Sequence, residues 1–353
     1  MQTHRSRLMT SGIVLAGSFP WANSAFEQLA PRPLVPVAHR PLIGFALSWL
    51  ENAGIHRVVV CGNRNSGDLE AQLARASAPE LDLSYLEDSM PRGAAGCVRD
   101  AAMSCGGDAF VVTDAAAIPD VDLHDLVETH RTSGAAVTMV VHREARGAGQ
   151  LPLQVPAGIY VLDRRIVESI AQHGFIDIKE HLIPRLSRAG ERVATYAVAG
   201  AVARVLNADT YLAVNDIVTA RTTSGRAVPA GYELRGESLV HREAIVESDV
   251  TFVGPVIVAA GARISHRAVL IGPASIGCDA TVGPGALVSR SAVWRRSTIG
   301  AGAVIDRSIV GDDGVVAGDR RLYRAVVAGA SRRASTVVPS VPVGDPQSPP
   351  SAA

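Results

Sequence analysis

Two patterns of apolar residues divide the chain. From residue 8 to residue 221, short apolar runs alternate with longer segments of mixed polarity. Alternation at this spacing predicts βαβ units around a mostly parallel sheet, so we expect a Rossmann-like α/β domain there. In such a sheet, ligands bind beyond the carboxyl ends of the strands. The expected strands are residues 13–16, 58–61, 81–86, 110–113, 137–141 and 158–162, and the expected helices are residues 69–74, 93–103 and 123–131.

From residue 244 the pattern becomes a repeat of six. Every sixth residue is apolar, and a smaller residue follows four positions after each one. The register slips by one at Ile299 and continues through Ala303 and Ile305. Short strands joined by tight corners, with large side chains inward, form a β-helix, which we predict for residues 244–330. The large positions are Val246, Phe252, Val258, Ile264, Leu270, Ile276, Val282, Val288 and Trp294; the smaller ones are Val250, Val256, Ala262, Ala268, Ala274, Ala280, Ala286, Ala292 and Thr298.

Two further segments are set apart by their composition. Residues 222–243 contain several glycines and a proline, which indicates a linker between the two domains. Residues 331–353 are rich in serine and proline and end in DPQSPPSAA, which predicts a disordered tail.

Composition excludes several classes of function. Lys and Arg together number 34, as do Asp and Glu, so the absence of net charge argues against a nucleic-acid partner. The chain has no apolar run as long as a membrane span, and the apolar run near the N-terminus is interrupted by Gly17 and Pro20, unlike a signal peptide. The four cysteines form no CxxC pair, which favours free thiols in a reducing cytoplasm.

Candidate chemistry begins at residues 12–43, GIVLAGSFPWANSAFEQLAPRPLVPVAHRPLI. An apolar run ends at Gly17, and a second stretch punctuated by prolines follows a long loop. A buried strand that delivers a loop to the phosphates of a nucleotide has this outline. Both ends of the stretch resemble the signature of sugar-1-phosphate nucleotidyltransferases (NDP-sugar pyrophosphorylases), which reads roughly LAGGxGTRLxPLT and then PKPLVPVxxKPLI.

Other stretches extend the resemblance as far as the repeats. PRGAAGCVRDAA at residues 91–102 resembles the family's PLGTAGAL segment, and PAGIYVL at residues 156–162 resembles NAGIYVL. Residues 175–198 and 207–215 resemble FDFEKDLFPKLLEEGKPLYGYPF and GTPEDYLEAN. The order of an α/β domain and a hexapeptide β-helix is that of mannose-1-phosphate guanylyltransferase-like enzymes. The resemblance implies that the β-helix is left-handed and that the α/β domain is a nucleotidyltransferase domain.

The resemblance also implies where ligands bind. The family transfers a nucleotide from an NTP to a sugar 1-phosphate, using a glycine-rich backbone cradle, an Arg, a Lys and Mg²⁺ held by two aspartates. Carried over to this chain, the nucleotide-binding residues are Leu15, Ala16, Gly17, Gly93 and Gly96. Gly158 falls in the sugar-binding motif, and Arg32 replaces the signature Lys.

Several positions depart from the family pattern. In place of GGxGTRL the chain has Gly17 followed by SFPWAN, in which Pro20 lacks an N–H group and two aromatic residues add bulk. The signature Arg is missing from this loop, and Arg32 keeps the charge of the signature Lys without its compact geometry. The stretch between residues 141 and 156 is too short for the family's EKP hairpin and contains no Lys, and Pro156 replaces the Asn of NAGIYVL.

The two metal-binding aspartates are also altered. Counting back without gaps from Asp122 places Ala116 at the first position, whereas a gap would place Asp114 there. Asp114 is therefore a candidate metal ligand, and a turn-capping role is the alternative. At the second position the resemblance places Arg204, a cation that opposes binding of a metal ion. We accordingly expect no resident cofactor, and Mg²⁺ only if the protein is active.

Three hypotheses follow. The first is a catalytically degenerate homologue, a regulatory or assembly subunit that binds a nucleotide or nucleotide sugar. It would be a cytoplasmic homo- or hetero-oligomer formed through the β-helix, with an active paralogue as one candidate partner. The alternative is an active or weakly active enzyme that makes an NDP-sugar for polysaccharide or glycan synthesis. The third is a hexapeptide acyltransferase, which needs a His base, and His266 is the one histidine within the regular hexads.

Overall fold

The chain forms two compact units. The computed structural model describes residues 9–17, 24–75, 80–88, 92–144, 153–200, 202–225, 227–329 and 338–339. The first unit holds most residues up to Leu206, and the second holds residues from Asn207 onward together with residues 24–29 and 36–39. The boundary expected at residue 221 falls within helix α7 (Ala208–Thr223), which the contacts assign to the second unit. The expected tail lies outside the described residues except for 338–339.

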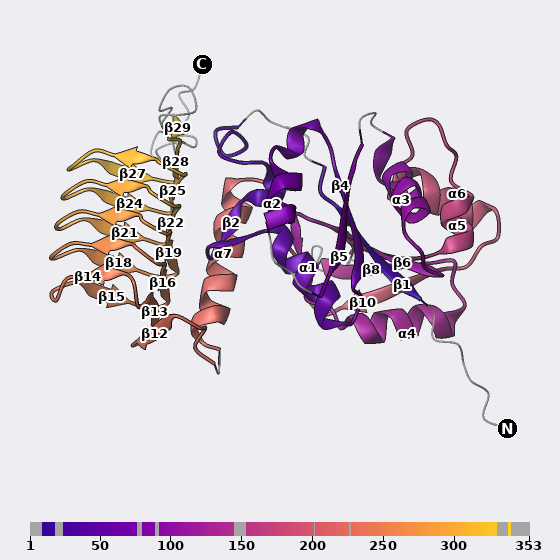
Figure 1. Ribbon diagram of the computed structural model, residues 1–353, viewed down its shortest axis with the longest axis horizontal. Coiled ribbons are helices and arrows are strands. Elements are labelled where there is room, and N and C mark those ends of the chain that lie inside the picture. Colours follow the sequence, from indigo (N-terminus) through magenta and orange to yellow (C-terminus); the bar gives the residue numbers. More distant parts are fainter. Residues whose placement is uncertain are drawn as a thin grey trace, which may run out of the picture. The chain divides into compact units, whose positions relative to one another are not determined.

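A seven-stranded sheet forms the centre of the first unit (Figure 1). Its order is β10-β8-β9-β6-β1-β4-β5, and β9 alone runs antiparallel to its neighbours. The apolar runs that predicted strands all lie in this sheet, which confirms the α/β class. The strands are β1 (Thr10–Leu15), β4 (Arg57–Gly62), β5 (Asp82–Glu87), β6 (Ala109–Asp114), β8 (Val137–Glu144), β9 (Leu153–Asp163) and β10 (Val193–Val198).

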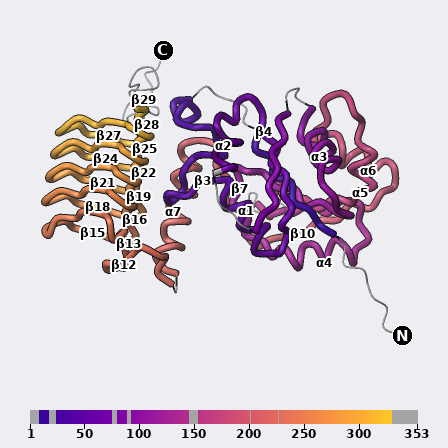
Figure 2. The backbone as a smooth tube through the Cα atoms, viewed as in Figure 1, coloured from indigo at the N-terminus to yellow at the C-terminus, as the bar shows by residue number. Residues whose placement is uncertain are grey.

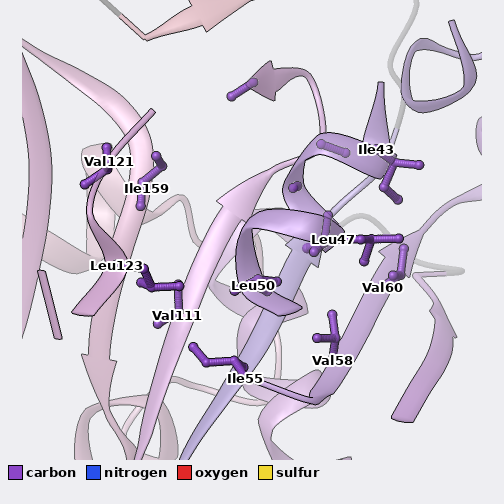
Figure 3. Packing of buried hydrophobic residues seen from close by; sticks show 14 of the residues in the cluster. Ile43, Leu47, Leu50, Ile55, Val58, Val60, Val111, Val121, Leu123 and Ile159 are labelled. Atoms are coloured by element: carbon purple, nitrogen blue, oxygen red, sulfur yellow. The ribbon is translucent and has the colours of Figure 1, made fainter. Parts of the chain in front are cut away.

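Helices cover both faces of the sheet because alternate strand residues point to opposite faces. Val14 of β1 belongs to a cluster that includes residues of α1, α2 and α4, and Ile13 belongs to a cluster that includes α3, α5 and α6. Figure 3 shows the first cluster, in which Leu47 and Leu50 of α1 lie beside Val58 and Val60 of β4. The helices are α1 (Ile43–Asn52), α2 (Leu69–Arg75), α3 (Gly93–Ser104), α4 (Leu123–Ser133), α5 (Arg164–Glu168) and α6 (Ile183–Arg188).

Short elements complete the first unit and its connections. The chain has 3-10 turns at Arg32–Leu34 and Arg64–Ser66 and a π turn at Ile178–Leu182, which leads directly into α6. Strands β7 (Ala117–Ile118) and β11 (Ala203–Arg204) pair antiparallel beside the sheet. Of the two remaining short strands, β3 (Arg40–Pro41) belongs to the first unit and β2 (Pro36–Val37) to the second. No helix among the described residues is long and apolar enough to cross a membrane.

The second unit contains a β-helix, as the hexads predict (Figure 2). Val246 pairs with Ile264 and Ile264 with Val282, so each of these coils contains 18 residues, or three hexads. Parallel strands stack into three sheets, and one of these sheets has an antiparallel strand at each end, β12 (Tyr232–Arg235) and β29 (Val338–Pro339). One sheet contains β13 (Ser238–His241), β16 (Val256–Val258), β19 (Ala274–Ile276), β22 (Ala292–Val293), β25 (Ile309–Val310), β28 (Ala325–Val327) and β29 (Val338–Pro339); the second contains β14 (Ile245–Val246), β17 (Arg263–Ile264), β20 (Thr281–Val282), β23 (Thr298–Ile299) and β26 (Val315–Val316); the third contains β15 (Thr251–Val253), β18 (Val269–Ile271), β21 (Leu287–Ser289), β24 (Val304–Asp306) and β27 (Arg321–Tyr323).

The register slip occurs one hexad earlier than the sequence indicates. Ile276 pairs with Val293, so Val293 takes the inward position that we predicted for Trp294. Trp294 is buried outside the coil, where its Nε1–H donates to the hydroxyl of Tyr211 at 2.8 Å. The prediction for Trp294 was therefore wrong, and so was that for Thr298, because Ser297 is the buried residue at the next corner.

Helix α7 packs on the β-helix through polar as well as apolar groups. Its Asn215 side chain accepts hydrogen bonds from the Ala38 N–H at 3.0 Å and from the Ser275 hydroxyl at 3.2 Å. Residues 36–39 are thereby held within the second unit. Asp216, the next residue of α7, faces the charges of Arg290 and Arg307.

Asp216 is expected to make stability depend on pH. Burial raises the pKa of its carboxyl from 3.8 to about 6, although the two arginines oppose the shift. The folded state therefore binds more protons than the unfolded state between these values, so stability falls as pH rises through this window. The free energy of unfolding should fall by no more than about 3 kcal/mol between pH 4 and pH 7, and Asp216→Asn should reduce this fall. Urea unfolding across this pH range is the measurement. Asp249→Asn is the exposed control, and an unchanged pH profile in Asp216→Asn would contradict the assignment.

Candidate functional site

The end of β1 presents the first predicted nucleotide-binding residues. Leu15 ends the strand, and the Ala16 N–H donates to the Cys61 carbonyl on β4 at 2.7 Å. The Ser66 hydroxyl donates to the Ala16 carbonyl at 3.1 Å. A Cβ on Gly17 would lie 3.2 Å from the Asn63 amide nitrogen, so this side chain leaves little room there. The departures at residues 18–23 lie outside the described residues.

The predicted glycines of α3 are required by local packing. Gly93 has φ +76°, and a Cβ there would lie 2.5 Å from the Ile176 carbonyl oxygen. A Cβ on Gly96 would lie 2.6 Å from the Cβ of Arg92. The Ala95 N–H donates to the same Ile176 carbonyl at 3.0 Å, which joins the start of α3 to the segment before the π turn. The nucleotide-binding role of both glycines stays a prediction.

A charged cluster that the sequence analysis missed surrounds the start of α3. Arg92 forms an ion pair with Asp100, and its Nε lies 3.9 Å from the Asp88 carboxylate. Arg99 also pairs with Asp100, at 3.1 Å. The Cys97 thiol donates to Asp88 at 3.1 Å, and burial together with this carboxylate raises the pKa of Cys97 above its usual range. This thiol is therefore protonated at neutral pH and is a poor nucleophile.

Asp114 ends β6 beside the end of β1, in register with Leu15. Its Oδ1 accepts a hydrogen bond from the Ala116 N–H at 2.8 Å, the turn-capping alternative from the sequence. Its Oδ2 accepts a hydrogen bond from Nη2 of Arg204. Arg204 is held in place because β11 pairs with β7, which puts Arg204 opposite Ala117. The two side chains are both about 30% exposed and form an ion pair.

Gly158, predicted to contact the sugar, lies next to this ion pair. It has φ +78°, and a Cβ there would lie 3.5 Å from both Arg204 Nη1 and the Asp114 Cβ. Tyr160 follows on the same strand and is buried. Burial raises the pKa of Tyr160 above its usual range, and the charges of Asp177 and Asp114 add to the effect while Arg204 opposes it. The predicted metal and sugar positions thus meet at one place, with a protonated phenol nearby.

The residues around Asp114 do not fit the Mg²⁺ that the family implies. Magnesium requires carboxylate oxygens with room for water in an octahedral shell. Here both oxygens of Asp114 are engaged, and the nearest partner is a guanidinium. Among the described residues, no three His, Cys, Asp or Glu side chains are grouped for a metal. No chemical step is therefore assigned to a metal ion at this site.

The remaining site residues are less closely grouped. Arg32 opens the 3-10 turn at Arg32–Leu34 and is partly exposed. His266 lies in a corner of the β-helix and is 54% exposed, with Nδ1 3.4 Å from the Glu247 carboxylate. The sequence did not show that Arg204 would pair with Asp114. The sequence did contain one signal for this pairing: an aspartate and an arginine stand at the two positions where the family has two aspartates.

Comparison with known proteins supports the same relationship. A nucleotidyl transferase family model matches residues 27–149, and a model of the GMPPB C-terminal domain matches residues 252–338. Mannose-1-phosphate guanylyltransferase of Mycobacterium tuberculosis is 26% identical over 83% of this chain and 81% of its own. UTP–glucose-1-phosphate uridylyltransferase of Synechocystis is 24% identical, over 76% of this chain and 78% of its own. Glucose-1-phosphate thymidylyltransferase of Streptomyces griseus is 27% identical, over 74% and 80%.

A solved structure shares the fold. HddC from Yersinia pseudotuberculosis, crystallised in complex with GMP-PN, has a TM-score of 0.50 and 12% identity over 60% of this chain and 99% of its own. The two family models follow one another in the order of the two units of the structure. The relatives named above all transfer a nucleotide to a sugar 1-phosphate, according to their names. The chain is therefore a homologue of the sugar-1-phosphate nucleotidyltransferases, with mannose-1-phosphate guanylyltransferases among its relatives.

Proposed function

We propose that this chain is a catalytically degenerate member of its family that acts as a regulatory or assembly subunit and still binds a nucleotide or nucleotide sugar. The observation that carries the proposal is the ion pair between Arg204 and Asp114. Nucleotidyl transfer builds negative charge on the phosphoryl oxygens, which the family's enzymes neutralise with Mg²⁺. A carboxylate that is already paired with a guanidinium is a poor ligand for that ion.

The contrast between the site and the scaffold supports the same proposal. The β-helix core is closely packed, and its inward residues are almost all fully buried. The substitutions that concern charge, at Arg32 and Arg204 and in residues 18–23, all fall at positions that bind phosphates or the metal ion in the family. The scaffold has therefore kept its packing while the charged groups changed, which suits a subunit that assembles but does not turn over substrate.

Direct assay tests the loss of catalysis. Purified protein with Mg²⁺, a panel of NTPs and a panel of sugar 1-phosphates is expected to release no pyrophosphate above a blank without enzyme. Clear turnover that Asp114→Ala abolishes would contradict the proposal, because Asp114 would then be serving the reaction. Asp82→Ala is the matched control, since Asp82 is an exposed aspartate on the edge strand β5 of the same sheet.

A second candidate function is an active or weakly active nucleotidyltransferase. The position of Asp114 at a strand end beside β1 favours it, as do relatives matched over about 80% of their length that are named as enzymes. Such an enzyme would have to release Asp114 from Arg204 before Mg²⁺ could bind. It predicts pyrophosphate release that rises with Mg²⁺ concentration.

The proposal extends to partners and location. We infer a homo- or hetero-oligomer in the cytoplasm formed through the β-helix, with an active paralogue that has an intact GGxGTRL loop as the expected partner. Co-purification of the two chains, with higher turnover than the paralogue has alone, would support a regulatory role. An acyltransferase role is less favoured, because His266 is exposed and pairs with Glu247, and acyl-CoA is expected not to bind.

A further inference from the structure

The guanidinium of Arg204 has donors beyond the one that contacts Asp114. A guanidinium carries five N–H donors, and among the described residues only the one from Nη2 to Asp114 is accounted for by a hydrogen bond. Nε is buried and has no hydrogen-bond partner among the described residues. Nη1 faces the space that a side chain on Gly158 would fill. The guanidinium therefore has a fixed position, and Nη1 is the donor that lies next to the predicted sugar motif.

Small residues flank the ion pair on the side of Gly158. That glycine has no side chain, and the residues after Asp114 are the alanines of Ala115–Ala117. Arg204 is 28% exposed and Asp114 31%, so neither is closed off from solvent. The Tyr160 hydroxyl nearby stays protonated at neutral pH and carries no charge.

The net charge of the Arg204–Asp114 site differs from that of a site with two aspartates. Two carboxylates repel a phosphate unless a divalent cation lies between them. One carboxylate and one guanidinium are neutral together, so a phosphate can approach without a metal ion. Guanidinium is also the side-chain cation best matched to phosphate oxygens, which it can contact with two parallel hydrogen bonds.

We propose that Arg204 takes the place of the divalent cation, so that this site binds the diphosphate of a nucleotide sugar without metal. The inference rests on the proposed function, since an active enzyme would need the metal. The ion pair has no net positive charge to offset the charge of a ligand, and an NTP carries about four negative charges at neutral pH whereas the diester diphosphate of a nucleotide sugar carries about two. The site therefore prefers the nucleotide sugar over the NTP.

Calorimetric titration of the full chain tests this binding mode. GDP-mannose, UDP-glucose and dTDP-glucose are the probes, each titrated in EDTA and again in Mg²⁺. We expect at least one probe to bind with a Kd that changes by less than about twofold between the two buffers, and GTP, UTP and dTTP to bind more weakly. A Kd that rises tenfold or more in EDTA would overturn the proposal, as would tighter binding of the NTP.

Substitution of Arg204 links the binding to the guanidinium. Arg204→Gln keeps most of the side-chain volume and is expected to raise the Kd in EDTA by about 10–100-fold, the effect of losing a charge-assisted hydrogen bond, while Arg204→Lys recovers part of the loss. Arg165→Gln is the matched control, because Arg165 is an exposed arginine paired with Glu191 in the same unit. Thermal unfolding without ligand checks that each variant is folded. Equal Kd values for Arg204→Gln and the unchanged protein would overturn the proposal.

The reverse substitution should bring the metal back. Arg204→Asp places two carboxylates at the site, so Mn²⁺, followed by electron paramagnetic resonance, is expected to bind this variant with GDP-mannose and not the unchanged protein. Bound Mn²⁺ in the unchanged protein would overturn the inference. If no nucleotide sugar binds, the inference is overturned too, but the proposed loss of catalysis is not affected. Pyrophosphate release, in contrast, would contradict the proposed function and would not bear on whether nucleotide sugars bind in EDTA.

Discussion

Replacing Tyr211 with alanine is expected to lower the free energy of unfolding of the second unit by about 3–5 kcal/mol. Tyr211 is fully buried on α7, where its ring lies 5.2 Å from Phe26 and 6.0 Å from Trp294 between centroids. Its hydroxyl donates to the Pro36 carbonyl at 2.7 Å and accepts from the Trp294 indole at 2.8 Å. The substitution therefore leaves a cavity and two buried polar groups without a partner, and both effects destabilise the fold.

A milder variant separates the two effects. Tyr211→Phe keeps the ring and removes only the hydroxyl, so it should cost about 1–3 kcal/mol. Tyr323→Phe is the control, because Tyr323 lies on β27 and is 56% exposed. Urea unfolding of the full chain, followed by tryptophan fluorescence, is the measurement. Equal midpoints for Tyr211→Ala and the unchanged protein would show that α7 does not stabilise the second unit.

The second large effect is expected from Gly93→Ala, which should destabilise the first unit by about 2–4 kcal/mol. Gly93 has φ +76°, and the new Cβ would lie 2.5 Å from a backbone oxygen that cannot rotate away. Gly54→Ala is a closely matched control, since Gly54 has φ +74° and nothing within 4 Å of its Cβ position. It should cost only the backbone strain, about 1–2 kcal/mol.

The difference between these two variants measures the steric contact alone. Thermal unfolding of both proteins gives that difference directly. If they unfold at the same temperature, then α3 can move away from Ile176, and the contact is not a fixed part of the fold. If Gly93→Ala is the less stable, this glycine is needed for packing whatever its role toward a nucleotide, and loss of ligand binding in the variant would not identify a binding residue.

The fold could be predicted from the sequence because its signals are local. Alternating apolar runs and a repeat of six each report on neighbouring residues, and the expected strand at residues 81–86 lies within one residue of β5 (Asp82–Glu87). The prediction was wrong at Trp294, where Val293 and Trp294 both suit an apolar position. Tyr211, 83 residues away, provides the hydrogen bond that holds Trp294 outside the coil, and no periodicity contains that information.

The candidate site was harder to predict for a related reason. The sequence identified Asp114 only by allowing a gap in the family's motif, and it treated Arg204 as a separate loss. Their pairing joins residues 90 positions apart, through the short ladder between β7 and β11. The glycines at positions 93 and 96 show the reverse problem. A family motif assigns them to a ligand, whereas the structure shows a packing need at both positions.

The chain segments that form the second unit limit how this protein could have arisen by recombination of domains. Residues 24–29 and 36–39 belong to that unit although they precede most of the first unit in the sequence. Phe26 and Ala38 contact Tyr211 and Asn215 of α7, so the unit is a discontinuous domain. A gene fusion that exchanged everything after residue 222 would separate α7 and these segments from the coils on which they pack. The β-helix is therefore not a detachable module, and recombination would have to carry the start of the chain along with its end.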